Sequence, residues 1–212
     1  MITVTAFKWV PPFAQGLVRD LRVRWALEEA GLAYDTRLIG QEDKTSADYR
    51  ALQPFGQVPA FEEDGRVLFE SGAIVLHIGE RSEALLPADE AGRARAVAWV
   101  FAALNSIEVF IQQLAEIDLF YPDQEWAKLN RPRVEGAVKK RLQELAAWIG
   151  DREYLEDRFT AGDLMMTTVL RVLRHTDLVD AEPVLKAYKE RCERRPAFQK
   201  ALAAQMASFE GR

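Results

Sequence analysis

The chain has 212 residues, of which 49% are hydrophobic, and a formal net charge of −5 at pH 7. This composition provides enough apolar material for one large or two small domains with a real core, which excludes general disorder. Acidic and basic residues are mixed along the chain, so no basic face points to nucleic acid as a partner.

Cysteine and histidine are scarce. Cys192 is the single cysteine and excludes an internal disulfide framework, while two histidines, His77 and His175, do not favour a protein-ligated zinc site. We expect no apolar run of the ~18–20 residues that a membrane span requires, and the first residues are typical of a strand rather than of a targeting segment. The sequence therefore predicts a cytoplasmic protein without a metal and without a membrane partner.

The first 81 residues predict an α/β domain. Ile2, Val4 and Ala6 alternate with threonines as in a strand, and apolar residues at helical spacing follow until Gly31, a typical helix C-cap. The predicted elements are a strand at 2–9, a helix at 15–30, a strand at 34–39, a short helix or turn at 46–52, a hairpin turning at 64–65 and a helix opening at 70–71. This order is typical of a thioredoxin-like domain with a mixed sheet.

The remainder predicts only helices. The expected helices lie at 92–120, 132–149, 161–175, 183–194 and 197–208, and Thr160 with Asp163 forms a capping-box pattern that we interpret as structural. We therefore expect three segments: a thioredoxin-like domain at 1–81, a linker at 82–91 and an all-helical domain at 92–212.

Two features between residues 53 and 81 suggest a binding site. A proline at 59 that enters an edge strand, with a cis Val58–Pro59 bond, would leave backbone groups available to pair with an extended peptide. Ser71, at the start of a helix, could present a hydroxyl and free N–H groups to a carboxylate. The alternatives are that Pro59 only blocks an edge strand and that Ser71 only caps a helix.

Four motifs together resemble the cytosolic glutathione transferase family, and they span nearly the whole chain. They read RWALEEAG at 24–31, LQPFGQVPAF at 52–61, LFESGAI at 68–74 and FTAGDL at 159–164. The resemblance implies a thioredoxin-like domain followed by an all-α domain, paired as a cytoplasmic homodimer. It also implies glutathione as the ligand, a small hydrophobic electrophile as the second substrate, and a role in detoxification.

The same resemblance assigns glutathione-binding roles by position. Val58, before cis Pro59, would pair with the cysteinyl backbone, while Ser71 would hold the γ-glutamyl carboxylate and Glu70 the amino group. Lys44 would hold the glycine carboxylate, or is simply a solvated loop lysine, and Gln57 is a further contact.

One expected group is absent. In this family a Tyr, Ser or Cys near the first strand or helix faces the glutathione sulfur, but residues 6–33 contain no Ser, Thr, Tyr or Cys. An ordinary thiol has a pKa of about 8.5, so lowering it needs a donor or a cation. The remaining candidate donors are Lys8, Gln15, Arg19, Arg22 and the backbone N–H groups at 15–17. Arg19 has the best case among the side chains, although it also fits a surface arginine.

The second substrate would need an apolar pocket. Its candidate walls are aromatic side chains, which are equally typical of a hydrophobic core: Trp9, Phe13, Phe110 and Tyr121. The predicted function is conjugation of a glutathione thiolate to a hydrophobic electrophile, or reduction of a peroxide. The missing hydroxyl leaves open a non-catalytic glutathione-binding or protein-interaction module of the same fold. A glutathione-dependent isomerase is a third alternative, which the absence of a Ser-Ser-Cys type run disfavours.

Overall fold

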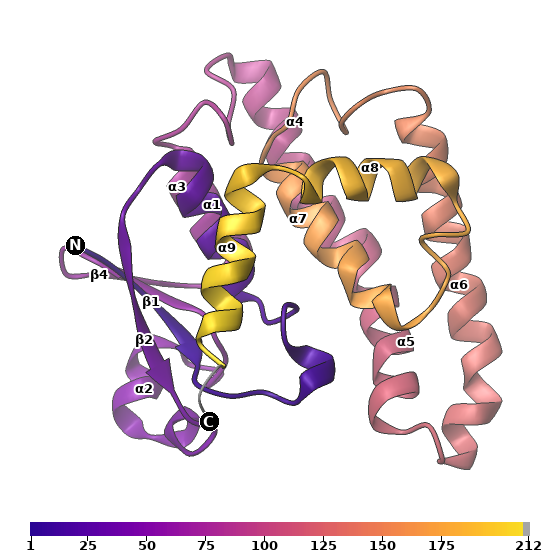
Figure 1. Ribbon diagram of the computed structural model, residues 1–212, viewed down its shortest axis with the longest axis horizontal. Coiled ribbons are helices and arrows are strands. Elements are labelled where there is room, and N and C mark those ends of the chain that lie inside the picture. Colours follow the sequence, from indigo (N-terminus) through magenta and orange to yellow (C-terminus); the bar gives the residue numbers. More distant parts are fainter. Residues whose placement is uncertain (210–212) are drawn as a thin grey trace. The chain divides into compact units, whose positions relative to one another are not determined.

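The computed structural model describes residues 1–209, which form two compact units (Figure 1). The first unit contains residues 1–86 together with residues 194–209, and the second runs from Pro87 to Glu193. Each unit has its own buried apolar core.

A four-stranded mixed sheet organises the first unit. Its strands are β1 (Ile2–Phe7), β2 (Tyr34–Ile39), β3 (Ala60–Glu63) and β4 (Arg66–Phe69), in the order β2-β1-β3-β4. β1 pairs in parallel with β2 and antiparallel with β3, and β3 pairs antiparallel with β4. The helices are α1 (Asp20–Ala30), α2 (Ala47–Leu52) and α3 (Ser71–Gly79). The predicted thioredoxin-like order is confirmed.

The first helix is shorter than its apolar pattern predicted. α1 begins at Asp20 rather than near residue 15, because a 3₁₀ turn occupies Pro12–Ala14 and Gly16 takes a positive φ of 77° that interrupts a right-handed helix. At the other end, Gly31 adopts the left-handed conformation with φ 66°, which confirms the expected C-cap.

The last helix, α9 (Pro196–Ala207), packs on α1 within the first unit. The Phe198 ring meets the edge of the Trp25 ring at a centroid distance of 4.8 Å, and Arg195 forms an ion pair with Glu29 at 2.6 Å. By contacts, the C-terminal residues therefore group with the sheet, whereas the sequence assigned them to 92–212. The division into 1–81, 82–91 and 92–212 stays a prediction.

All the secondary-structure elements of the second unit are helices, as predicted for this region, and loops connect them. α4 (Glu90–Phe101) passes through a π-helical segment (Ala102–Glu108) into α5 (Val109–Phe120), and α6 spans Glu125–Ile149. α7 (Ala161–Leu170) continues into a 3₁₀ turn (Arg171–His175), and α8 spans Pro183–Glu193. α6 starts earlier than the predicted residue 132 and carries Pro132 inside it.

α7 is the core helix of this unit, because every one of its residues is buried. The predicted capping box is present: Thr160 Oγ1 accepts from the Gly162 amide, and the Asp163 carboxylate accepts from the Thr160 amide. Asp163 also accepts from the Leu155 amide and from the Tyr188 hydroxyl. Asp163 therefore links the loop at Leu155 and helix α8 to the start of α7, in addition to its part in the helix cap.

The continuous helix formed by residues Glu90–Phe120 is long and apolar enough to match a membrane span by length and composition, contrary to our expectation from the sequence. Core helices of water-soluble proteins pass the same test, and α4 packs closely against α7 within this unit.

Candidate functional site

The start of α3 is built to receive an anion. Ser71 is the first helical residue and is only 5% exposed, and the first intrahelical amide bond runs from Ile74 to the Glu70 carbonyl. The three preceding amides, at residues 71–73, are thus left without helical acceptors. Together with the helix dipole, such amides favour a negative charge.

Arg22 places a buried cation at the same point. Its guanidinium Nη1 donates to Ser71 Oγ at 3.2 Å, and the whole residue is 3% exposed. Because Ser71 Oγ accepts this bond, its own proton is directed elsewhere, and no acceptor for that proton is found among residues 1–209. A ligand carboxylate would supply the missing acceptor and would meet the positive charge of Arg22 behind the hydroxyl.

Glu70, immediately before the helix, has an unusual backbone. Its φ is 67° and its ψ is 113°, a region that non-glycine residues rarely occupy. The exposed Glu70 carboxylate makes no hydrogen bond or ion pair within the described chain. It is therefore available to an ammonium group beside the Ser71 subsite.

The edge before β3 matches the predicted peptide-binding strand. The Val58–Pro59 bond is cis, as expected, and both residues are buried. Neither the amide nor the carbonyl of Val58 forms a backbone hydrogen bond within residues 1–209. The β3–β4 ladder ends where Ala60 pairs with Phe69, and Val58 lies two residues before Ala60 while Ser71 lies two residues after Phe69. The open edge and the anion subsite therefore lie at the same end of the hairpin.

The loop before Val58 is held rigidly. The Tyr49 hydroxyl donates to the Gln57 carbonyl at 2.6 Å, and burial raises the pKa of Tyr49 to about 12, so this donor stays protonated at neutral pH. Gly56 has a φ of 62°, and a Cβ there would lie 2.6 Å from the Lys44 carbonyl oxygen. The Gln57 side chain is exposed.

Lys44 therefore lies beside this loop. Its ammonium donates to Gln41 Oε1 at 3.0 Å and sits 5.7 Å from the centre of the Phe7 ring. These contacts hold the half-buried Lys44 ammonium beside Gln41 and Phe7, while the Lys44 backbone carbonyl lies against Gly56.

The structure changes the account of the groups proposed to activate the glutathione thiol, which are Arg19 and the backbone amides at 15–17. Arg19 is the exposed residue that precedes α1, and it makes an interaction of its own within the chain. The Gln15 and Leu17 amides are not free helix-start donors, because they bond to the carbonyls of Pro12 and Ala14. The proposed role of those two amides was wrong, since the helix starts later.

The four aromatic residues suggested for an apolar pocket are all at least partly accessible. Trp9 and Phe13 are exposed in the first unit. In the second unit, the Arg141 guanidinium lies 4.9 Å from the centre of the Phe110 ring. The exposed Tyr121 ring packs against the Trp126 ring at a centroid distance of 5.3 Å, with the two planes tilted by 55°. Their assignment to one pocket stays a prediction.

The part of the chain that the structure describes shows neither a metal-binding cluster nor an exposed cysteine. Within residues 1–209, no group of three or more His, Cys, Asp or Glu side chains is placed to hold a metal ion. Cys192 is buried in α8.

The sequence suggested Arg22 only as one of several donors near the thiol, and it missed the contact with Ser71. The basic residues at 19, 22 and 24 are visible in the sequence. Which of them turns toward α3 depends on how α1 packs against α3, and no local pattern reports that packing.

Comparison with known proteins agrees with this geometry. Residues 5–80 match the family described as "Glutathione S-transferase, N-terminal domain". The chain is 34% identical over 213 residues to Glutathione S-transferase 3 of Zea mays, covering 87% of this chain and 88% of that protein. It is 30% identical over 164 residues to the glutathione S-transferase GstA of Escherichia coli O157:H7, covering 74% and 78%.

Solved structures support the fold. A glutathione transferase family member from Pseudomonas fluorescens, crystallised with two glutathione molecules bound, superposes with a TM-score of 0.83 at 23% identity, covering 95% of this chain and 92% of that one. Glutathione transferase F7 from Populus trichocarpa also gives 0.83 at 23% identity, covering 97% and 99%.

Proposed function

The chain belongs to the glutathione S-transferase family, and we propose that it binds glutathione along Val58 and the start of α3 and transfers the glutathione thiolate. The carrying observation is the buried contact of Arg22 with Ser71, which prepares a carboxylate site at the end of an unpaired peptide edge. The relatives crystallised with glutathione support the choice of ligand.

Each end of glutathione has a matching group in this site. The γ-glutamyl carboxylate accepts from the Ser71 hydroxyl and from the α3 amides, with the Arg22 charge behind them. The neighbouring ammonium meets the Glu70 carboxylate. The cysteinyl amide and carbonyl pair with Val58, and the glycine carboxylate meets Lys44, with Gln57 as a further contact.

The reaction uses the bound sulfur as a nucleophile. In conjugation, the thiolate forms a carbon–sulfur bond to a small hydrophobic electrophile and either displaces a leaving group, which departs with its bonding electrons, or adds to a polarised double bond that then takes up a proton. In peroxide reduction, two glutathione thiols become a disulfide while the peroxide yields alcohol and water. Trp9, Phe13, Phe110 and Tyr121 are the proposed apolar contacts of the second substrate. The positive charge of Arg19 favours the ionised sulfur over the neutral thiol.

A non-catalytic glutathione-binding module is the second candidate. The observation that favours it is the absence of any hydroxyl or thiol side chain between residues 6 and 33, where relatives of the family place the group that faces the sulfur. We place the protein in the cytoplasm as a homodimer under either function, because the family resemblance implies both.

The two candidates differ in thiolate formation. The test is a titration with glutathione at neutral pH, followed by thiolate absorbance and by calorimetry, for the wild type, Ser71→Ala and Arg19→Ala. The transferase predicts a saturable thiolate signal that Arg19→Ala weakens while binding persists. Binding without thiolate supports the module, and no binding by the wild type contradicts both.

A further inference from the structure

A second candidate binding site lies in the helical unit. A pocket of about 490 Å³ opens where the end of α5, the first turns of α6 and the segment after the 3₁₀ turn at 171–175 meet. Its volume falls within the range of small-molecule sites in proteins, about 300–1,000 Å³. All of its lining residues belong to this unit, whereas the glutathione-site residues described above belong to the other.

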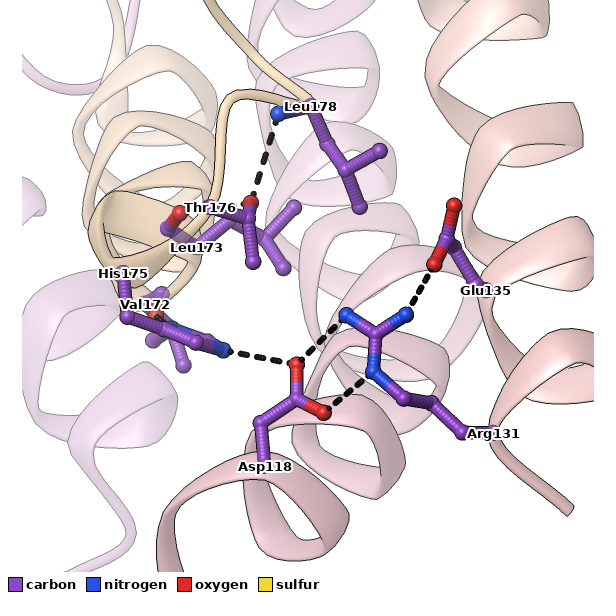
Figure 2. A network of polar contacts seen from close by, with 8 residues as sticks. All are labelled: Asp118, Arg131, Glu135, Val172, Leu173, His175, Thr176 and Leu178. Atoms are coloured by element: carbon purple, nitrogen blue, oxygen red, sulfur yellow. Dashed lines mark hydrogen bonds and ion pairs between the residues drawn. The ribbon is translucent and has the colours of Figure 1, made fainter. Parts of the chain in front are cut away.

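One wall of the pocket is fixed by charged hydrogen bonds. Figure 2 shows the Asp118 carboxylate between His175 and Arg131. Arg131 donates through Nε to Asp118 Oδ1 at 2.7 Å and through Nη2 to Oδ2 at 3.1 Å, and its Nη1 donates to Glu135. His175 Nε2 lies 3.2 Å from the same carboxylate, and His175 Nδ1 lies 3.1 Å from the Val172 carbonyl oxygen.

This wall is therefore a poor anchor for a further ion. The Arg131 guanidinium already meets two carboxylates, and both ring nitrogens of His175 face acceptors. The histidine has no free nitrogen to act as a base, so the network holds three segments in place without supplying a catalytic group. Its effect on the pocket is rigidity.

Two lining charges remain available. Within residues 1–209, the Lys128 ammonium and the Asp177 carboxylate form no hydrogen bond and no ion pair. They line one pocket and yet form no ion pair with each other, so their charged atoms lie farther apart than the 4 Å of an ordinary pair. A ligand that satisfies both must carry a negative and a positive group with a spacer between them.

The rest of the lining sets the nature of that ligand. Ile117, Leu119 and Pro122 add apolar surface. The Thr176 hydroxyl already donates to the Leu173 carbonyl oxygen. We propose that this pocket binds a small zwitterion with an apolar side chain, that is, an α-amino acid or a dipeptide. Its carboxylate pairs with Lys128, its ammonium with Asp177, and its side chain with the apolar wall.

The test uses L-leucine as the probe, with glutathione present at saturation, followed by two-dimensional NMR of the ¹⁵N-labelled protein. We expect saturable shifts at the lining amides. N-acetyl-L-leucine lacks the ammonium and L-leucinamide lacks the carboxylate, so each should bind about tenfold more weakly, as expected for the loss of one charge-assisted contact.

Two variants test whether Lys128 binds the carboxylate of the ligand and Asp177 its ammonium. Lys128→Met should weaken L-leucine about tenfold and leave L-leucinamide unchanged, whereas Asp177→Asn should weaken L-leucine and leave N-acetyl-L-leucine unchanged. Lys140→Met and Asp180→Asn are matched controls, because both residues are exposed in the same unit and do not line the pocket. Circular dichroism checks that all four variants fold.

Several results would overturn the proposal. These are no saturable shift with L-leucine, equal affinity for L-leucine and its two derivatives, or the same loss in the control variants as in Lys128→Met and Asp177→Asn. Loss of the L-leucine shifts in Ser71→Ala would also reject it, because the amino acid would then occupy the glutathione site. Tighter binding of inorganic phosphate than of L-leucine would identify an anion site instead.

Discussion

At the scale of single residues, the site depends on a buried arginine that donates a hydrogen bond to a serine hydroxyl. An arginine that is almost fully buried needs a counter-charge or several acceptors, because desolvation of an unpaired guanidinium is costly. Ser71 supplies one acceptor to Arg22, which makes a further interaction of its own within the chain. The positive charge next to Ser71 and the amides at the start of α3 together favour a carboxylate beyond the hydroxyl, which is why this contact indicates an acidic ligand.

Two substitutions of Arg22 separate the effect of its charge on glutathione binding from the effect of its size. Arg22→Met removes the cation and the donor while filling similar space, and we expect glutathione affinity to fall about tenfold to a hundredfold, which corresponds to roughly 1.5–3 kcal/mol for a charged hydrogen bond. Arg22→Lys keeps the charge and should recover part of the affinity. Calorimetric titration with glutathione measures both, and equal losses in the two variants would argue against a role for the charge.

Tyr49 positions the loop that carries Gln57 and Val58. Tyr49→Phe removes the 2.6 Å bond to the Gln57 carbonyl and leaves that acceptor without its partner. We expect a loss of stability of about 1–3 kcal/mol and a several-fold loss of glutathione affinity, measured by urea unfolding and by calorimetry. Tyr121→Phe is the control, since that hydroxyl lies on an exposed residue; an equal loss of affinity there would show that the effect is not local to the loop.

At the scale of elements, the sequence predicted the strands and most helices because their signals are local. The capping box at Thr160, the C-cap at Gly31 and the turn at Asp64-Gly65 each depend on a few neighbouring residues. The start of α1 was predicted wrongly, because apolar spacing continued back to Leu17 while Gly16 took a positive φ. The sequence allowed that backbone conformation but did not require it.

The buried carboxyl at the start of α7 should make stability depend on pH. Burial raises the pKa of Asp163 from 3.8 to about 6, although four hydrogen bonds favour its ionised form. The folded state then holds a proton that the unfolded chain has released. The stability that this proton contributes is fully present below pH 3.8 and is lost as pH rises through about 6; it amounts to about 3 kcal/mol.

Urea unfolding of the wild type and of Asp163→Asn between pH 4 and pH 8 measures this contribution. The variant should be less stable at every pH, because both carboxylate oxygens accept hydrogen bonds and asparagine replaces one of them with an NH2 group, which cannot accept. The stability of the wild type should fall more steeply between pH 4 and pH 6 than that of the variant. Parallel curves would show that Asp163 does not titrate in this range.

At the scale of the whole molecule, the sequence predicted a thioredoxin-like part followed by helices, and the family relationship agrees. The sequence assigned the last helix to the helical segment 92–212, whereas by contacts this helix groups with the first unit. The pairing of Phe198 with Trp25 and of Gln205 with Asp20 joins residues more than 170 positions apart. Periodicity shows that a helix is amphipathic and does not identify the surface that it covers, so the C-terminal boundary could not be found from the chain alone.

Phe198→Ala tests whether α9 completes the core of the first unit. Phe198 is 1% exposed against Trp25, and removal of such a buried ring typically costs about 3–5 kcal/mol. We expect faster hydrogen exchange in α1 and weaker glutathione binding, because Arg22 lies on that helix. Phe198→Leu should retain most of the stability. Unchanged exchange in α1 would show that α9 is not needed for its order.

The most direct test of the glutathione site is a double-mutant cycle read by calorimetry with glutathione. The wild type, Ser71→Ala, Arg22→Met and the double variant are titrated under one salt condition, with Ser106→Ala, an exposed serine in the second unit, as the control. If Arg22 acts on the ligand through Ser71, each single variant loses about tenfold or more, and the double variant loses little beyond the worse of the two. Glutathione binding that is unchanged in Ser71→Ala, or losses that simply multiply, would contradict the account.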